Sequence, residues 1–148
     1  MPIKKMIHII PYTANYFQAL NALWQQAFPN DAEWNRADFA IPEKTRFQPD
    51  LLLVAIDGAS VVGSVMAGYD GHRGWISRIA VLKSSRKQGI GKLLLEDAER
   101  RLVGMGCVKV NLQVVEANAS VVEFYRACGY DIEPRISLSK ILRRPDRS

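Results

Sequence analysis

Apolar residues recur at helical spacing most clearly between residues 89 and 105. This spacing predicts a helix with one buried stripe. Two pairs of opposite charge, Glu96 with Arg100 and Asp97 with Arg101, are four residues apart and are expected to interact on its other faces. The predicted stripe comprises Ile90, Leu93, Leu94, Ala98, Leu102 and Met105.

A different pattern, short apolar runs or strict alternation, predicts strands. Asp57-Gly58 lies between two such runs and predicts a tight hairpin turn, because glycine readily takes a positive φ angle. The expected strands are residues 3–10, 51–56, 60–69, 75–82 and 108–114, followed by a final antiparallel pair at 130–133 and 137–142.

Three further helices complete the predicted order. One follows Thr13 and ends near Phe28, a short one begins near Pro42, and one runs from an Asn118 cap through Cys128 to Gly129. A meander of antiparallel strands then leads into a strand–helix–strand crossover. We therefore expect an α+β fold with a mixed, mostly antiparallel central sheet and helices on both faces, in a single domain over residues 1–148.

Composition narrows the class of protein. The chain of 148 residues has a net charge of +5, and its longest apolar runs are too short for a membrane span. Two cysteines are too few for a disulfide framework, so we expect a cytoplasmic protein with no metal and no membrane partner. The basic residues are dispersed, which argues against nucleic acid as the partner, and residues 143–148 are expected to form a disordered basic tail.

The densest basic cluster coincides with a glycine motif, Arg86-Lys87-Gln88-Gly89-Ile90-Gly91, between a predicted strand and the best helix. The N-terminus of a helix presents unpaired N–H groups and a positive dipole end. Glycines there let a phosphate approach the backbone closely. The motif therefore predicts a phosphate-binding turn.

The same motif has three other interpretations. A P-loop needs glycine where Arg86 stands and Ser or Thr after Lys92, and both are missing. A dinucleotide fingerprint needs a third glycine at Leu94. A plain strand-to-helix turn remains the simplest alternative.

With its flanks, this segment resembles the acyl-CoA-binding motif of the GNAT N-acetyltransferase superfamily. The resemblance rests on Trp75 to Val81, on Arg86-x-x-Gly89-x-Gly91 and on a second motif of Asn118, Phe124-Tyr125 and Gly129-Tyr130. The run from Gly68 to Trp75 is similar to small bacterial members whose substrates are undefined.

The resemblance implies a GNAT acyl-CoA N-acyltransferase fold with acetyl-CoA as acyl donor. The strand at 75–82 would splay from that at 108–115, and the pantetheine arm would pair with the backbone of Ile79 and Val81. The residues implied for cofactor binding are Ile79, Ala80, Val81, Arg86, Lys87, Gln88, Gly89, Ile90, Gly91, Lys92, Asn118 and Tyr125.

The resemblance also implies that Tyr125 is the general acid, donating a proton to the leaving thiolate. A tyrosine on an apolar helix face is otherwise a packing residue. Asp70 is the first candidate for the general base, and the other candidates are Glu116, Glu33 and Glu43. The two N-terminal helices would wall the acceptor site, where Trp24 and Phe47 are expected to pack in the core.

The function that we expect is direct transfer of an acetyl group to a primary amine in a ternary complex. The acceptor is an amine of a small molecule or of a protein, and the sequence does not decide between a monomer and a homodimer. A CoA-binding sensor or interaction module without turnover is the alternative from another class. A nucleic-acid-binding protein ranks last, because no basic surface is evident.

Overall fold

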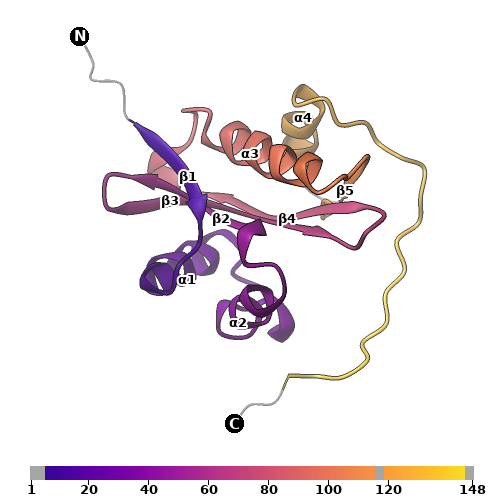
Figure 1. The fold of residues 1–148 in the computed structure, drawn as a ribbon, viewed down its shortest axis with the longest axis horizontal. Helices are drawn as coiled ribbons and strands as arrows, with labels where there is room; N and C mark the ends of the chain where they lie inside the picture. The colour runs from indigo at the N-terminus through magenta and orange to yellow at the C-terminus, as the bar shows by residue number, and fades with distance from the viewer. Residues whose placement is uncertain (1–5, 116–118, 146–148) are drawn as a thin grey trace. The chain divides into compact units, whose positions relative to one another are not determined.

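The computed structural model describes residues 6–115 and 119–145, which fall into two compact units that divide after Leu112. The first unit contains a five-stranded sheet in the order β1-β2-β3-β4-β5 (Figure 1). Neighbouring strands are antiparallel except β4 and β5, which are parallel. The strands are β1 (Ile7–Pro11), β2 (Leu52–Asp57), β3 (Ser60–Tyr69), β4 (Gly74–Val81) and β5 (Val110–Leu112).

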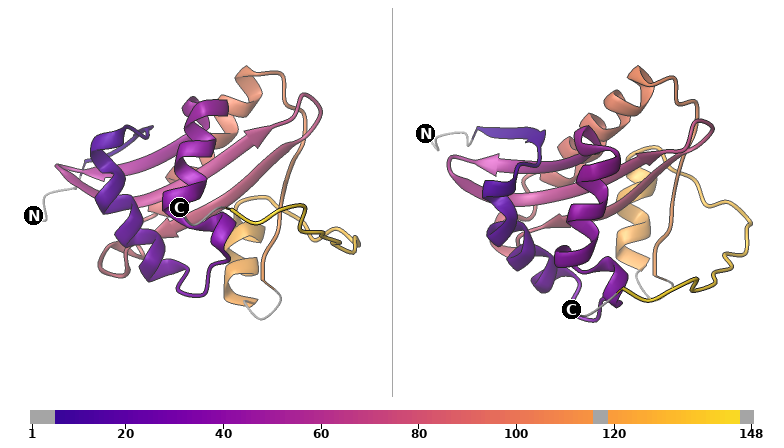
Figure 2. Two further views of the ribbon diagram at one scale, coloured as in Figure 1. Left: turned by 90° about the horizontal axis from the view of Figure 1, so that it is seen from below. Right: turned by 60° about the horizontal axis from the view of Figure 1, so that its bottom comes forward.

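Helices cover both faces of this sheet, as predicted. The helices α1 (Phe17–Ala27) and α2 (Ala37–Phe47) lie on one face, and α3 (Ile90–Gly104) lies on the other (Figures 1 and 2). Thr13 precedes a short 3-10 turn, Ala14–Tyr16, and its side chain caps no helix, so the predicted cap is wrong. Helix α2 begins at Ala37, five residues before the predicted start at Pro42, which lies inside the helix.

The core on the α1 side is formed by Leu20, Leu23 and Trp24, packed against alternate residues of β2 that include Leu52 and Val54. On the other face, Gly63 of β3 lets α3 come close. A Cβ at this position would lie 2.9 Å from Leu94 Cδ1 and 3.0 Å from the carbonyl oxygen of Ala80. The hairpin and the crossover predicted from the sequence are both present.

The buried stripe of α3 differs from the prediction. Leu93 and Met105 are 41% and 48% exposed, whereas Leu95 is buried. Asp97 is also largely buried, and it pairs there with both Arg100 and Arg101. The predicted Asp97–Arg101 pair is therefore confirmed, but Arg100 pairs with Asp97 and not with Glu96.

The second unit contains α4 (Ala119–Ala127). The N–H of Tyr130 donates to the carbonyl of Tyr125, and the N–H of Gly129 (φ 95°) donates to that of Arg126. These two bonds form a Schellman motif, so Gly129 is the C′ residue, as predicted. Asn118, the predicted cap, lies outside the described residues, as do residues 3–5 of the first predicted strand and residues 146–148 of the predicted tail.

Two strand predictions fail. Residues 130–145 contain no strand, so the predicted pair at 130–133 and 137–142 is wrong. Alternation in this segment has no buried face to match, since Ile136, Leu138 and Leu142 are each nearly 90% exposed. Strand β5 has three residues instead of seven, and Val108 outside it is 94% exposed. None of the helices in the described part of the chain combines the length and apolarity needed to cross a bilayer.

Candidate active site

Strand β4 extends five residues beyond its pairing with β5. The paired positions are Gly74 with Val110, Trp75 with Asn111 and Ile76 with Leu112, where β5 ends. In the described part of the first unit, residues 77–81 therefore have a strand partner only in β3 (Figure 1). The pairing of these two strands therefore stops at Ile76 and Leu112, and within the first unit it leaves one edge of β4 open beyond that point.

A bulge in β4 decides which residues face the open edge. Between the pairs Ser64–Ala80 and Met66–Ser77 the register shifts by one, so that two residues of β4 stand opposite Val65. The extra residue reverses the alternation along the strand. Before the bulge, the N–H of Gly74 donates toward β5, to Lys109 O; after it, the N–H of Leu82 donates to Val62 O, next to β3.

This reversal places Ile79 and Val81 on the open edge. Backbone groups of a strand alternate between its two edges, so Ala80 shares the β3 edge with Leu82, and Ile79 and Val81 face away. The carbonyl of Val81 accepts a bond of 3.3 Å from Arg86 Nε, which agrees with this direction. Ile79 and Val81 are the two residues that the sequence predicted to pair with an extended ligand.

The bulge forms at Arg78, which has a φ of 55°. Its carbonyl accepts a hydrogen bond of 2.9 Å from the buried hydroxyl of Ser64, and that hydroxyl accepts one of 2.9 Å from Trp24 Nε1. Its guanidinium forms a two-point ion pair with Asp31 and lies 4.5 Å and 4.0 Å from the ring centroids of Trp24 and Phe28. This residue was not singled out from the sequence.

The open edge leads along the chain to the predicted phosphate-binding turn. Lys87 and Gly89 both have positive φ angles, 65° and 76°, and Gly89 is the N-cap of α3. No side chain caps this helix, so its first N–H groups are available to an anion. A Cβ at Gly89 would meet no atom within 4 Å, so its surface is open.

The other predicted ligand-binding residues of this turn divide by exposure. Arg86, Lys87, Gln88 and Lys92 are exposed, and Gly91 is half-buried. Ile90 is 2% exposed, so its side chain belongs to the core and only its backbone can serve a ligand. Ala80 is buried too, on the β3 edge of the strand. An open strand edge that ends at an uncapped helix fits an extended ligand with amides at one end and phosphates at the other.

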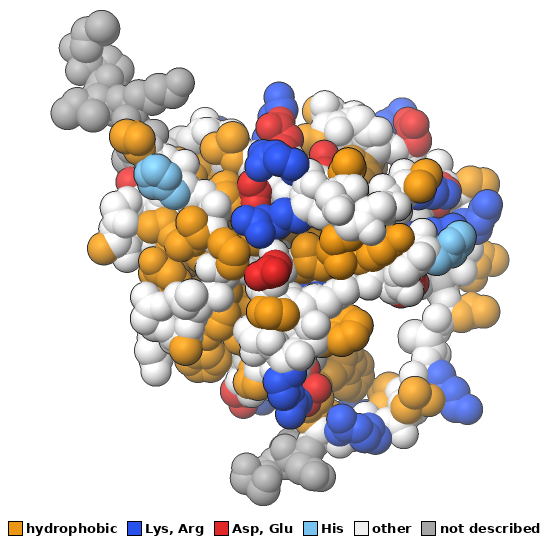
Figure 3. All heavy atoms as spheres, in the orientation of Figure 1, with side chains coloured by type: hydrophobic (Ala, Val, Ile, Leu, Met, Phe, Trp, Pro, Cys, Tyr) orange, Lys and Arg blue, Asp and Glu red, His pale blue; other side chains and the backbone are white. Residues whose placement is uncertain are grey.

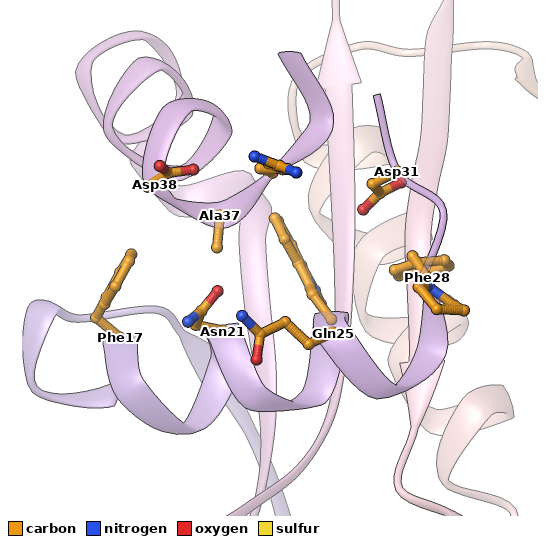
Figure 4. Close-up of a pocket in the computed structure, with 10 residues that line it drawn as sticks. Phe17, Asn21, Gln25, Phe28, Asp31, Ala37 and Asp38 are labelled. Carbon is orange, nitrogen blue, oxygen red and sulfur yellow. The ribbon is translucent and has the colours of Figure 1, made fainter. Parts of the chain in front are cut away.

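A cavity of about 540 Å³ lies between α1 and α2 (Figure 4). Asn21 and Gln25 of α1 and Asp38 of α2 border it. Its other lining residues include Phe17, Trp24, Phe28, Asp31, Arg36 and Ala37. Trp24, Phe28 and Asp31 are the residues that contact Arg78, so the wall of this cavity is continuous with the bulge. Trp24 is buried as expected, but Phe47 is 74% exposed, and its predicted core position is wrong.

Tyr125, the predicted acid, lies on α4 in the second unit. Its ring packs edge-on against Phe124 and Tyr130, with centroid distances of 5.1 Å and 5.9 Å. Burial, and then the charge of Cys128, raise the pKa of Tyr125 to about 12. The phenol therefore keeps its proton at neutral pH.

Asp70, the predicted base, lies in the exposed turn after β3. Its Oδ1 accepts the backbone N–H of His72 at 2.8 Å and that of Arg73 at 2.7 Å. These hydrogen bonds lower the pKa of Asp70. A base role stays a prediction, and the turn weighs against it, because a carboxylate of lowered pKa binds a proton weakly. Of the other candidates, Glu43 pairs with Arg46, and Glu116 lies outside the described residues.

Comparison with known proteins agrees with this geometry. The profile of the acetyltransferase (GNAT) family matches residues 16–130, and the chain belongs to this family. An acetyltransferase of Pectobacterium atrosepticum is 37% identical over 126 residues, which are 85% of this chain and 89% of that protein. An uncharacterized N-acetyltransferase of Yersinia pestis is 38% identical over 109 residues, 74% of this chain and 77% of its own length.

Solved structures share the fold. An aminoglycoside N-acetyltransferase in complex with CoA has a TM-score of 0.77 at 18% identity and covers 97% of this chain and 99% of its own. The PaiA N-acetyltransferase of Thermoplasma acidophilum, in complex with coenzyme A, has a TM-score of 0.75 at 20% identity over 88% of this chain and 93% of its own. Family and relatives together make this protein an acetyl-CoA-dependent N-acetyltransferase.

Proposed function

We propose that the enzyme transfers the acetyl group of acetyl-CoA to a primary amine by direct attack, with both substrates bound at once. The observation that carries this proposal is the reversed alternation of β4. It turns the backbone of Ile79 and Val81 toward an edge that ends at the uncapped N-terminus of α3.

In this proposal the first unit binds the acyl donor. Ile79 and Val81 pair with the amides of the pantetheine arm as a neighbouring strand would. The N–H groups from Lys87 to Gly91 hold the pyrophosphate, with Arg86 and Lys92 supplying positive charge. The predicted contact from Asn118 lies outside the described residues.

The proposed chemistry is acyl transfer without an acyl-enzyme. The amine nitrogen forms a bond to the thioester carbonyl carbon, the C–S bond breaks, and the sulfur takes a proton. Tyr125 is the proposed donor of that proton, and its pKa of about 12 keeps the phenol protonated when the amine attacks. A ternary complex fits a site in which neither cysteine belongs to a nucleophile motif.

For the acceptor we propose the cavity between α1 and α2. Both aromatic rings and polar side chains line it, which suits a molecule with an apolar body and a cationic amine. In the described part of the chain the carboxylate of Asp38 has no hydrogen-bond or ion-pair partner, so it is available to an ammonium group. Small-molecule and protein amines both satisfy this chemistry.

Acidic and basic side chains lie side by side on the face drawn in Figure 3. Helix α3 itself carries the ion pairs of Asp97 with Arg100 and Arg101. A polyanion binds best to a surface of one sign, so this pattern favours a small phosphorylated ligand over nucleic acid.

The test compares the thermal stability of three proteins with and without acetyl-CoA. At about a hundred times its dissociation constant, acetyl-CoA should stabilise the native protein by about 2.7 kcal/mol. Gly89→Glu should abolish this shift, because it places a side chain and a negative charge at the anion site. Gly58→Glu is the matched control, since Gly58 also has a positive φ (64°) and open surroundings, but lies in the β2–β3 turn.

Loss of the shift in Gly89→Glu alone supports the proposal. Equal shifts in all three proteins would place the acyl donor elsewhere. A shift without release of free thiol, across a panel of amines, would favour the alternative of a CoA-binding sensor.

A further inference from the structure

We propose that Arg78 is a positioning residue for the acyl donor, which it does not touch with its side chain. By holding the bulge of β4, it keeps the backbone of Ile79 and Val81 turned to the open edge. This inference rests on the proposed function of that edge.

Arg78 adopts a backbone conformation that costs free energy. With a φ of 55° it lies in the left-handed region, where the Cβ of any residue except glycine crowds the backbone. Glycine is the usual residue at such a bulge position. An arginine persists there only if other contacts hold it.

The contacts that hold Arg78 come from three directions. Ser64 donates a hydrogen bond to its carbonyl, Asp31 pairs with its guanidinium at two points, and the rings of Trp24 and Phe28 lie against the same group. The side chains of Arg78 and Asp31 are 11% and 17% exposed, so water screens their attraction little. A strained backbone is thus fixed at both its carbonyl and its side chain.

The consequence for the site follows from the alternation of the strand. Without the extra residue at Arg78, the even-numbered residues of β4 would continue to face the open edge, as Gly74 does. Ile79 and Val81 would then point their N–H and C=O groups at β3. The side chain of Arg78 therefore acts on the acyl donor through the backbone of its neighbours.

Two substitutions at Arg78 separate this role from a merely structural one. Arg78→Ala and Arg78→Gly both remove the ion pair with Asp31 and the ring contacts. Only alanine retains the backbone strain, because glycine takes a φ of 55° freely. If the side chain serves to hold the bulge, alanine should weaken acetyl-CoA binding by about tenfold, and glycine should stay within about threefold of the wild type.

The measurement is isothermal titration of each folded variant with acetyl-CoA, with urea denaturation to confirm that each is folded. Asp31→Asn supplies a second test if Arg78→Ala does not fold, and a loss of affinity of about fivefold is expected. Asp50→Asn is its control, since it removes an exposed carboxylate from the 3-10 turn Pro49–Leu51 and should not change the affinity.

The outcomes distinguish the two proposals. A wild-type protein that does not bind acetyl-CoA refutes the proposed function itself. If the wild-type protein binds acetyl-CoA and both Arg78→Ala and Arg78→Gly bind it as tightly as the wild type, the role of Arg78 is overturned. An unchanged affinity in Asp31→Asn overturns it too. Weaker binding in alanine than in glycine supports it.

Discussion

The indole N–H of Trp24 donates to the hydroxyl of Ser64, which in turn donates to the carbonyl of Arg78, and both bonds measure 2.9 Å. Ser64 is fully buried and joins α1 to the bulge of β4. Ser64→Ala would leave the Trp24 donor and the Arg78 acceptor buried without this partner, so we expect a loss of about 1–3 kcal/mol in the free energy of unfolding. Urea denaturation at neutral pH measures it.

Ser85→Ala is the control for this substitution. Ser85 is also buried, 6% exposed, but its hydroxyl has no hydrogen bond in the described part of the chain. Its replacement should change the free energy of unfolding by less than about 0.5 kcal/mol. Equal losses in the two variants would mean that the bonds of Ser64 contribute nothing specific.

Stability should depend on pH through Lys44. Its ammonium is partly buried, with Gln48 Oε1 at 2.9 Å, and burial lowers the pKa of Lys44 to about 8. Between pH 8 and 10.5 the unfolded chain holds a proton that the folded chain has lost, so the free energy of unfolding rises with pH in this window. Lys44→Met keeps the apolar stem and should remove this rise. Urea denaturation of both proteins at pH 7 and pH 9.5 checks this prediction. If the difference in the free energy of unfolding between wild type and Lys44→Met is the same at both pH values, the prediction is wrong.

Catalysis should depend on the phenol of Tyr125. Tyr125→Phe keeps the ring and its packing on Phe124, so we expect kcat to fall by about 10²–10⁴-fold with little change in stability. Since the pKa of Tyr125 is about 12, its ionisation should not reduce the rate between pH 8 and 10. Steady-state assays of thiol release measure both effects.

Tyr130→Phe is the matched control, because Tyr130 packs edge-on against the same ring at 5.9 Å. It should retain the wild-type kcat within about threefold. If Tyr125→Phe is equally active, Tyr125 is a packing residue and another group protonates the sulfur.

Asp70→Asn tests the base. The amide oxygen of asparagine can accept the same two backbone N–H bonds, so the turn should persist. Since the lowered pKa weakens Asp70 as a base, we expect kcat/KM to stay within about threefold of the wild type. A fall of a hundredfold or so at unchanged thermal stability would instead establish the carboxylate as the base.

The fold was predictable where local signals and packing agree. The Asp57-Gly58 turn specifies its hairpin, and the apolar stripe of α3 is long enough to identify the helix. The prediction of the stripe nevertheless included Leu93, which is exposed, and omitted Leu95, which is buried. The predicted strand at 137–142 shows the limit of such patterns. Alternation of apolar and polar residues describes the two faces of one strand. A strand also needs a partner strand and a surface to pack against, and the pattern contains neither.

The candidate site was predictable in part for the same reason. The turn at Gly89 is a local motif, so sequence alone located it. The ion pair of Arg78 with Asp31 joins residues 47 positions apart, and a positive φ at an arginine contradicts every local preference. A charged residue inside an otherwise uncharged strand was the one available signal, and its meaning depends on contacts that only the folded chain defines.

The open edge of β4 also bears on how the protein behaves in solution. Unpaired strand backbone is a template on which a segment of another chain can add, and proteins generally protect such edges. Within the first unit, residues 77–81 present this kind of surface, with Arg86 covering only the carbonyl of Val81. A ligand that pairs with Ile79 acts as a cap on that surface. By the same reasoning, binding of the acyl donor should reduce self-association of the protein through this edge. Preparations that contain CoA should therefore remain monodisperse at concentrations where the free protein associates.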